Sequence, residues 1–512
     1  MATLNWIGKE AVVNHDKEVP FKLLEKVPSA SVGKESKNLI IHGDNLEALK
    51  ALMPFYKGKV KCIYIDPPYN TGNEKWKFND NVNSPKIREW IGKVVGAESE
   101  DLTRHDKWLC MMYPRLKLLK DLLTDDGVLF ISIDENEIGN IILLAKEIFG
   151  DDSNDFLIWR KTGKQSNTKR IARVKTTHEY ILVIYKNKGQ ISLSKIKLMP
   201  QWQNEYTNPD NDKRGIYKQG IISNKEEYSN PKSKNFYAIT TPGGKVYSRE
   251  WYISKKEFDY LLADNRIYFP KSGNGVPAKK IFQDEEQSYY LDSIIDRMGD
   301  FTSAREEIIE LFGDKDIFTT PKPRKLIKEL IRCASTSDSI ILDSFSGSGT
   351  SGHAVLDLNK EDGGNRQFIL VEMEDDVAKK ITAERVKRAI KKFDYNDGFE
   401  YCELAKPLFN EKGQINEACS YDELASYIYF TETQTNIDKK SLKDPFIGES
   451  HGVSYFLIYA GKDKNDLTRE TLLNLKVSGS AVIYADRCLV DEEELKAKGV
   501  VFKQIPYEIK VY

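Results

Sequence analysis

One stretch of the chain decides the fold, a predicted buried strand that ends abruptly in a rigid loop: Lys61-Cys62-Ile63-Tyr64-Ile65-Asp66-Pro67-Pro68-Tyr69-Asn70-Thr71-Gly72. β-Branched and aromatic residues favour a strand as far as Ile65. The two prolines then fix their own φ and bias the residues before them away from helix. The loop therefore carries the carboxylate of Asp66, an outward carbonyl from Pro67 and the ring of Tyr69. These groups suit a planar amino group, which needs two acceptors and a surface for stacking; a simple tight turn is the alternative.

The composition is that of a globular protein without a general attraction for nucleic acid. The 512 residues are 40% hydrophobic and 30% charged, which allows about two to four domains. The net charge is −1, so any affinity for DNA must come from local charge. Six scattered cysteines without Cys-x-x-Cys spacing argue against zinc or disulfides and for a reducing compartment. With no apolar run long enough for a bilayer, we expect a cytoplasmic protein that needs no metal.

A second motif far downstream predicts a site for a nucleoside. Residues 339–343 predict a strand, followed by Ser344-Phe345-Ser346-Gly347-Ser348-Gly349 and by a helix from Thr350 to Asp357. Glycines at such a turn let backbone amides approach a ligand at the helix N-terminus. The next predicted strand, 367–372, ends in Glu372, about twenty residues past the glycines, where dinucleotide folds hold ribose hydroxyls.

The segments around these motifs predict a mostly parallel sheet covered by helices. Residues 38–44 predict a strand that ends in Gly-Asp, and a helix follows from Asn45 to Leu52. Asp44 suits either a ligand amine or the helix N-cap, and for this residue alone we favour the cap. An amphipathic helix at 104–123 and a strand at 127–134 continue the alternation. Open sheets of this kind bind ligands at the carboxyl ends of their strands.

A basic segment follows, in which Glu179 is the one acid between Trp159 and Lys197. Its first half predicts a flexible loop, and residues 180–185 predict a strand. A solvated surface is the ordinary explanation of a charge run. Because this run interrupts a balanced chain beside a candidate catalytic loop, we favour contact with the DNA backbone. The candidate DNA-binding residues are Arg160, Lys161, Lys164, Lys169, Arg170 and Arg173.

The two motifs together resemble the permuted, beta-group amino-methyltransferases of DNA, and most closely the modification (Mod) subunit of type III restriction-modification systems. The resemblance rests on Asp66-Pro67-Pro68-Tyr69 followed downstream by Phe345-Ser346-Gly347-Ser348-Gly349. Residues 43–49, 107–134, 178–180, 320–323 and 502–510 agree with further segments of that family. The Pro-Pro loop precedes the glycine loop, whereas cofactor-first methyltransferases have the reverse order.

The resemblance implies a Rossmann-like, S-adenosylmethionine-dependent α/β methyltransferase fold, with a mostly parallel seven-stranded sheet and a circularly permuted motif order. It also implies an inserted α+β target-recognition region and a small C-terminal α/β domain. The expected division is an extension at 1–36, the core at 37–197 and 301–400, the insertion at 198–300 and an assembly domain at 401–512.

The activity implied is methyl transfer from S-adenosyl-L-methionine to N6 of adenine in double-stranded DNA, after the base is flipped out of the helix. The catalytic residues would be Asp66, Pro67, Pro68 and Tyr69. The cofactor would be held by Asp44, Asp343, Phe345, Gly347, Gly349, Glu372 and Lys322.

Lys322 would meet the cofactor carboxylate, unless it is an ordinary surface lysine at a helix start. Cytosine-N4 methylation and a non-catalytic DNA-recognition subunit are the alternative functions. The implied partners are a second copy of the chain and a helicase-nuclease restriction subunit, with no membrane.

Overall fold

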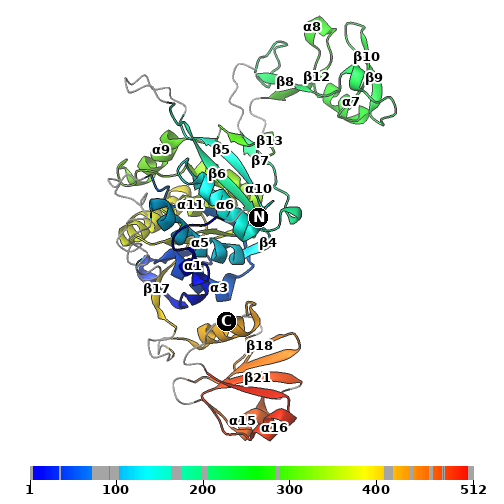
Figure 1. Cartoon of the computed structure of the whole chain (residues 1–512). Coiled ribbons are helices and arrows are strands. Elements are labelled where there is room, and N and C mark those ends of the chain that lie inside the picture. Colours follow the sequence, from blue (N-terminus) through cyan, green and yellow to red (C-terminus); the bar gives the residue numbers. More distant parts are fainter. Residues whose placement is uncertain are drawn as a thin grey trace. The chain divides into compact units, whose positions relative to one another are not determined.

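The computed structural model divides the chain into two compact units, Met1–Ile196 with Tyr290–Tyr512, and Lys197–Tyr289 (Figure 1). The described residues are 4–33, 36–71, 92, 103–162, 174–198, 206–282, 287–296, 298–408, 415, 419–437, 442–460, 465–475, 477 and 479–505.

The larger unit is built on one ten-stranded sheet. Neighbouring strands run parallel from β17 to β4, and β6 is antiparallel to both β4 and β5. The order across the sheet is β1 (Lys22–Lys26), β17 (Glu400–Pro407), β2 (Leu39–His42), β16 (Gln367–Glu372), β15 (Ile340–Asp343), β3 (Val60–Ile65), β4 (Leu123–Ile133), β6 (His178–Tyr185), β5 (Asn154–Arg160) and β14 (Ile294–Ile295).

The predicted α/β methyltransferase fold is confirmed, but the predicted number of seven strands is too low. Strands β2, β16, β15, β3, β4, β6 and β5 form the expected part of the sheet. Strand β17 pairs with β2 at one edge, β1 pairs with β17, and β14 pairs with β5 at the other edge. The added strands occupy backbone groups that an edge strand would otherwise expose. Residues 1–36 are therefore more than an extension, since β1 belongs to the sheet.

Helices cover both faces of this sheet. On one face, α3 (Asn45–Tyr56), α5 (Arg104–Leu122) and α6 (Ile138–Phe149) share a hydrophobic core with Ile63 and Ile65 of β3. On the other lie α10 (Arg324–Ala334), α11 (Thr350–Asp362) and α13 (Glu384–Phe393), and Gly352 of α11 contacts side chains of β16. The alternation of side chains along each strand divides the two cores.

The ends of two helices differ from the predicted ends. Helix α11 continues to Asp362 instead of ending at Asp357, because Leu358 is still buried and Gly363, with φ +70°, supplies the left-handed end. Helix α5 ends at Leu122 and β4 begins at once at Leu123. The other helical segments among the described residues of this region are α1 (Lys9–Val12), α2 (His15–Glu18), α9 (Phe301–Phe312), α12 (Asp375–Val377), a π-helical turn at Ala378–Ala383, and 3-10 turns at Pro28–Ala30 and Lys188–Gln190.

The C-terminal part of the larger unit forms a separate four-stranded sheet. Its order is β18 (Phe446–Ser450), β19 (Val453–Leu457), β21 (Ser480–Ala485) and β23 (Val500–Gln504). The helices here are α14 (Tyr421–Thr433), α15 (Arg469–Asn474) and α16 (Glu492–Ala497). Phe21 and Leu23 pack against this core, so the N-terminal segment contacts both sheets of the unit.

The smaller unit has its own core, centred on Trp251 and Phe258. A three-stranded antiparallel sheet joins β8 (Tyr217–Ile221), β12 (Ala278–Phe282) and β11 (Ile267–Tyr268); a hairpin joins β9 (Phe236–Thr240) and β10 (Val246–Glu250), and α7 spans Lys255–Ala263. The unit ends at Tyr289, ahead of the expected 300, because β14 already belongs to the large sheet.

Candidate active site

The sheet order places the two motif loops at one edge. Strands β3 and β15 are parallel neighbours, with Leu342 opposite Ile63. The loop that follows β3 and the glycine loop that follows β15 therefore leave the sheet side by side. Asn45, at the start of α3, donates from Nδ2 to the Ser344 carbonyl at 3.2 Å. The first turn of α3 is thereby tied to the glycine loop.

Hydrogen bonds from neighbouring helices hold the loop after β3. Trp108 Nε1 donates to the Pro68 carbonyl at 2.7 Å, whereas the described part of the chain supplies no donor to the Pro67 carbonyl. Asn70 has φ +58°, a conformation that asparagine tolerates better than most residues. Its Nδ2 donates to the carboxylate of Glu137 and to the Arg104 carbonyl. The loop is thus anchored while the Pro67 carbonyl stays available.

The Asp66 carboxylate is bound by Lys322. The Lys322 Nζ lies 2.8 and 2.7 Å from the two carboxylate oxygens and 2.9 Å from the Tyr69 hydroxyl. Lys322 stands between Pro321 and Pro323, which restrict its backbone. Its side chain is only 7% exposed. The surface-lysine alternative is therefore wrong, and contact with a cofactor carboxylate stays a prediction.

The Tyr69 hydroxyl also contacts Glu179, a carboxylate that the sequence analysis did not assign to the site. The Tyr69 hydroxyl donates to Glu179 Oε2 at 3.1 Å, and Lys161 Nζ lies 3.3 Å from Glu179 Oε1. Glu179 was considered only as the one acid in a basic segment. That isolation was a usable signal, because an acid kept among so many cations needs a structural reason.

Lys161 is paired with Glu179, and its contact with the DNA backbone stays a prediction. Arg160 is exposed, as that prediction requires. The other four candidates, Lys164, Lys169, Arg170 and Arg173, lie outside the described residues.

Burial changes the proton affinity of the loop. It raises the pKa of Asp66, and the neighbouring Lys322 ammonium opposes that rise. Burial also raises the pKa of Tyr69 well above its ordinary value, and the nearby carboxylates Asp66 and Glu179 add to the rise. Tyr69 is therefore a neutral phenol, and its hydroxyl donates a hydrogen bond to Glu179.

The glycine loop has the conformation that only glycine adopts easily. Gly347 and Gly349 have φ of +47° and +76°. A Cβ on Gly349 would lie 3.0 Å from the Thr382 carbonyl oxygen, and one on Gly347 would lie 3.2 Å from the Phe318 ring. Gly347 N donates to Glu372 Oε2 at 2.9 Å. The loop is therefore closed against the acid at the end of β16.

The acids at this edge are set up for a polar ligand. Burial raises the pKa of Asp343 and of Glu372 to about 7 in each case. Asp343 accepts from the Phe345 amide at 3.1 Å. The buried hydroxyls of Ser344 and Ser346 have no hydrogen-bond partner among the described residues. Carboxyls of shifted pKa and unpaired hydroxyls beside a helix N-terminus fit a nucleoside with a polar tail.

Asp44 is the N-cap of helix α3, which confirms the role that the sequence analysis favoured for it. It accepts from the amides of Leu46 and Glu47 at 2.9 and 3.2 Å, and Arg115 Nη2 lies 3.4 Å from its other oxygen. A role toward the cofactor's adenine stays a prediction.

In the described ranges, no three His, Cys, Asp or Glu side chains are grouped to hold a metal ion. None of the helices in those ranges is both long and apolar enough to cross a membrane.

The fold and these two loops define an α/β methyltransferase. The family model of N6 and N4 methyltransferases, described as DNA methylase, matches residues 60–384. The chain therefore belongs to this family of DNA methylases.

Two similar proteins with known names support this family assignment. The chain is 34% identical over 456 residues to the Mod subunit of the type III restriction-modification enzyme StyLTI from Salmonella typhimurium, covering 82% of this chain and 68% of the relative. It is 31% identical to the EcoP15I Mod subunit from Escherichia coli, with 80% and 72% covered. Among solved structures, the cytosine-N4-specific PvuII DNA methyltransferase is 13% identical with a TM-score of 0.35, and 71% and 95% of the two chains are covered.

The family model and the two Mod subunits confirm the predicted resemblance of this chain to Mod-type DNA methyltransferases.

Proposed function

We propose that this protein transfers a methyl group from S-adenosylmethionine to N6 of adenine in double-stranded DNA. The observation that carries the proposal is the meeting of two loops, Asp66–Tyr69 and Ser344–Gly349, at neighbouring carboxyl ends of the sheet. One loop offers acceptors for an amine, and the other offers a nucleoside site.

The loop after β3 acts on the target amine. The N6 lone pair is delocalised into the purine ring, so this nitrogen is a poor nucleophile. The Asp66 carboxylate and the Pro67 carbonyl accept its two N–H bonds and favour a pyramidal nitrogen. The ring of Tyr69 is the stacking surface for the base. Accurate positioning is the main contribution of such a site.

The glycine loop holds the donor. When bound, S-adenosylmethionine supplies a methyl group already activated on a sulfonium. Glu372 takes the ribose hydroxyls and Asp44 lies toward the adenine. The methionine end is held by Asp343, Phe345, Gly347 and Gly349.

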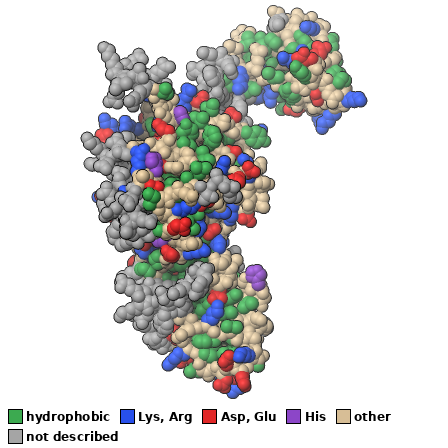
Figure 2. Space-filling view, in the orientation of Figure 1, with side chains coloured by type: hydrophobic (Ala, Val, Ile, Leu, Met, Phe, Trp, Pro, Cys, Tyr) green, Lys and Arg blue, Asp and Glu red, His purple; other side chains and the backbone are tan. Residues whose placement is uncertain are grey.

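Because N6 is out of reach within a duplex, the adenine must be flipped out of the stack. The face drawn in Figure 2 supports local rather than global attraction to DNA, since acidic, basic and hydrophobic side chains are interspersed among its described residues. We assign backbone contact to the basic segment after Arg160 and base reading to the unit Lys197–Tyr289.

The test is to incubate the protein with methyl-labelled S-adenosylmethionine and unmethylated mixed-sequence DNA, digest the DNA to nucleosides and separate them. Label should appear in N6-methyl-2′-deoxyadenosine. Label in N4-methyl-2′-deoxycytidine would overturn the adenine assignment, and unlabelled DNA would indicate a non-catalytic recognition subunit. The Asp66→Ala variant should lose labelling while it still binds the donor.

The similarity to relatives named as Mod subunits of restriction-modification enzymes supports a proposal about assembly. We propose that the protein forms a homodimer and works with a restriction subunit in a restriction-modification system. Light scattering on the purified protein tests the first part, and a mass equal to one chain would contradict it.

A further inference from the structure

Four charged side chains form a row of alternating sign at the candidate active site. Lys322 Nζ lies 2.7 Å from Asp66 and 3.6 Å from Glu179, and Lys161 Nζ lies 3.3 Å from Glu179. Glu179 and Lys322 are almost wholly buried. The row therefore holds two carboxylates and two ammonium groups where unbalanced charge is costly.

The position of Lys322 conflicts with the binding of a target base. Its ammonium contacts both oxygens of Asp66 and lies 5.0 Å from the centre of the Tyr69 ring. These are the carboxylate and the ring that the proposed function assigns to the target base. An ammonium offers N–H donors as an amino group does. Lys322 thus occupies the place of the target amine, and it must leave Asp66 before the amine can donate there.

Glu179 gives the departing ammonium a second carboxylate. Withdrawing Lys322 from a buried carboxylate would ordinarily leave both charges unpaired, which is strongly unfavourable. Glu179 Oε2 is already 3.6 Å from Lys322 Nζ, so a short movement brings the two within hydrogen-bond distance. The Tyr69 hydroxyl contacts both Lys322 and Glu179, so the three groups can stay in contact during the movement.

We propose, on the basis of the proposed function, that Lys322 moves from Asp66 to Glu179 when the target base enters. Lys322 and Glu179 are then positioning residues for methyl transfer. Together they keep Asp66 charged and occupied in the empty enzyme and release it to the incoming amine. Lys161 balances Glu179 in the empty enzyme.

The test is the Glu179→Gln variant, which removes the charge but keeps an oxygen that accepts from Tyr69. We expect kcat for DNA methylation to fall about 100-fold, the magnitude expected of a misplaced catalytic group. The Kd for S-adenosylmethionine, measured by calorimetry without DNA, should stay within about twofold, because this movement serves the base and not the donor. Glu179→Asp, which keeps the charge one methylene further away, should recover part of the lost rate.

The matched control is Glu361→Gln, because Glu361, like Glu179, is a carboxylate beside two cations, here a lysine and an arginine. It lies on α11 away from these loops, and we expect it to leave kcat unchanged. Should Glu179→Gln fail to fold, Glu179→Asp alone tests the claim, with kcat about tenfold down at unchanged donor Kd.

Two results would overturn this role of Glu179. One is a kcat within about threefold of wild type in the folded variant. The other is a loss of donor affinity as large as the loss of kcat, which would mean that the row serves the donor.

Failure of the proposed function gives a different result. Wild-type protein that methylates cytosine N4 would overturn the adenine assignment alone, since that base also brings an amino group. Wild-type protein that labels no DNA would overturn both.

Discussion

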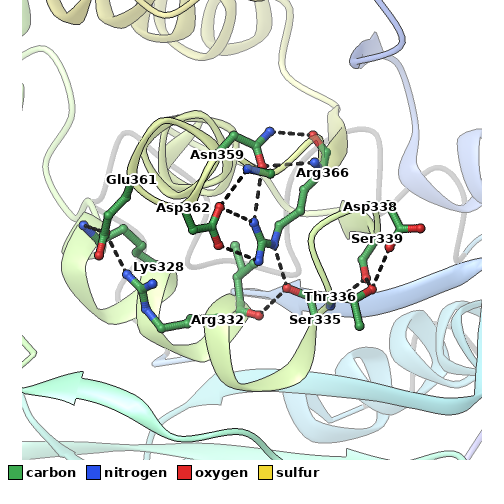
Figure 3. A network of polar contacts seen from close by, with 12 residues as sticks. Lys328, Arg332, Ser335, Thr336, Asp338, Ser339, Asn359, Glu361, Asp362 and Arg366 are labelled. Carbon is green, nitrogen blue, oxygen red and sulfur yellow. Dashed lines mark hydrogen bonds and ion pairs between the residues drawn. The ribbon is translucent and has the colours of Figure 1, made fainter. Parts of the chain in front are cut away.

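The two ends of β15 and β16 carry opposite kinds of polar chemistry. Beside their amino ends, Arg366 binds Asp362, Asn359 and Ser335, and Glu361 binds Lys328 and Arg332 (Figure 3). At their carboxyl ends, Asp343 and Glu372 receive hydrogen bonds only from amides and a hydroxyl among the described residues. The amino end pairs Glu361 and Asp362 with cations, whereas Asp343 and Glu372 at the carboxyl end have no cation beside them among the described residues.

The difference appears in proton affinity. Burial would raise the pKa of Glu361, but hydrogen bonds from Arg332 and Lys328 outweigh it and lower the pKa to about 2. At the other end, burial dominates and the pKa values of Asp343 and Glu372 rise to about 7. A network built for stability pairs its charges, whereas a site built for a ligand keeps polar groups that the ligand will complete. Substitutions at the two ends should therefore separate activity from stability.

The largest effect is expected at Asp66. Asp66→Asn preserves shape but removes the carboxylate that accepts the target amine, so kcat should fall about 1,000-fold, the upper range for loss of one electrostatic contact. Donor affinity should be unchanged. Asp362→Asn, in the amino-end network, is the control and should keep the wild-type kcat. Nucleoside analysis of labelled DNA measures the kcat of both variants. An active Asp66→Asn variant would contradict the functional difference between the carboxyl and amino ends of the strands.

The next largest effect is a loss of stability at Arg366. This side chain is buried and makes hydrogen bonds to Ser335, Asn359 and Asp362. Arg366→Met should lower the free energy of unfolding by about 2–3 kcal/mol, because hydrogen bonds to a charged partner are lost together. Urea unfolding measures this loss. The kcat of the folded fraction should match wild type, and a lower kcat would mean that the amino end also serves catalysis.

A smaller effect should appear in the pH dependence of stability. The Asp343 carboxyl has an ordinary pKa of 3.8 and a folded pKa of about 7, so between these values the unfolded chain has lost a proton that the folded protein keeps. The free energy of unfolding should therefore fall as pH rises from about 4 to 7, with Glu372 adding to the fall. In Asp343→Asn the fall should be shallower. Urea unfolding from pH 4.5 to 7.5 checks this, and an identical slope would show that Asp343 is ionised.

The smallest effect is expected at Glu361. Its lowered pKa gives the opposite sign: its contribution is present above about 4.5 and is lost as pH falls toward 2. Because its side chain is 31% exposed, Glu361→Gln should cost at most about 1 kcal/mol at pH 7. The difference between the variant and wild type should vanish in acid. A difference that grows in acid would contradict the pairing with Arg332 and Lys328.

The sequence was sufficient for features that depend on near neighbours. The strand ending at Ile65 and the rigid Pro67-Pro68 turn follow from residue type alone, as do the capping of α3 by Asp44 and the glycines before α11. The alternation of strands and helices was enough to predict that the two loops share one edge of the sheet, because parallel strands end together.

Only the tertiary structure decided which charges meet. Lys322 and Asp66 are 256 positions apart, and the part played by Glu179 depends on β6 lying beside β4. The same holds for the extra strands β1, β17 and β14. Local patterns extend over a few residues, since they reflect backbone geometry and side-chain periodicity. The partner of a buried charge is instead set by which distant segments pack together, and the need to neutralise that charge does not name the partner.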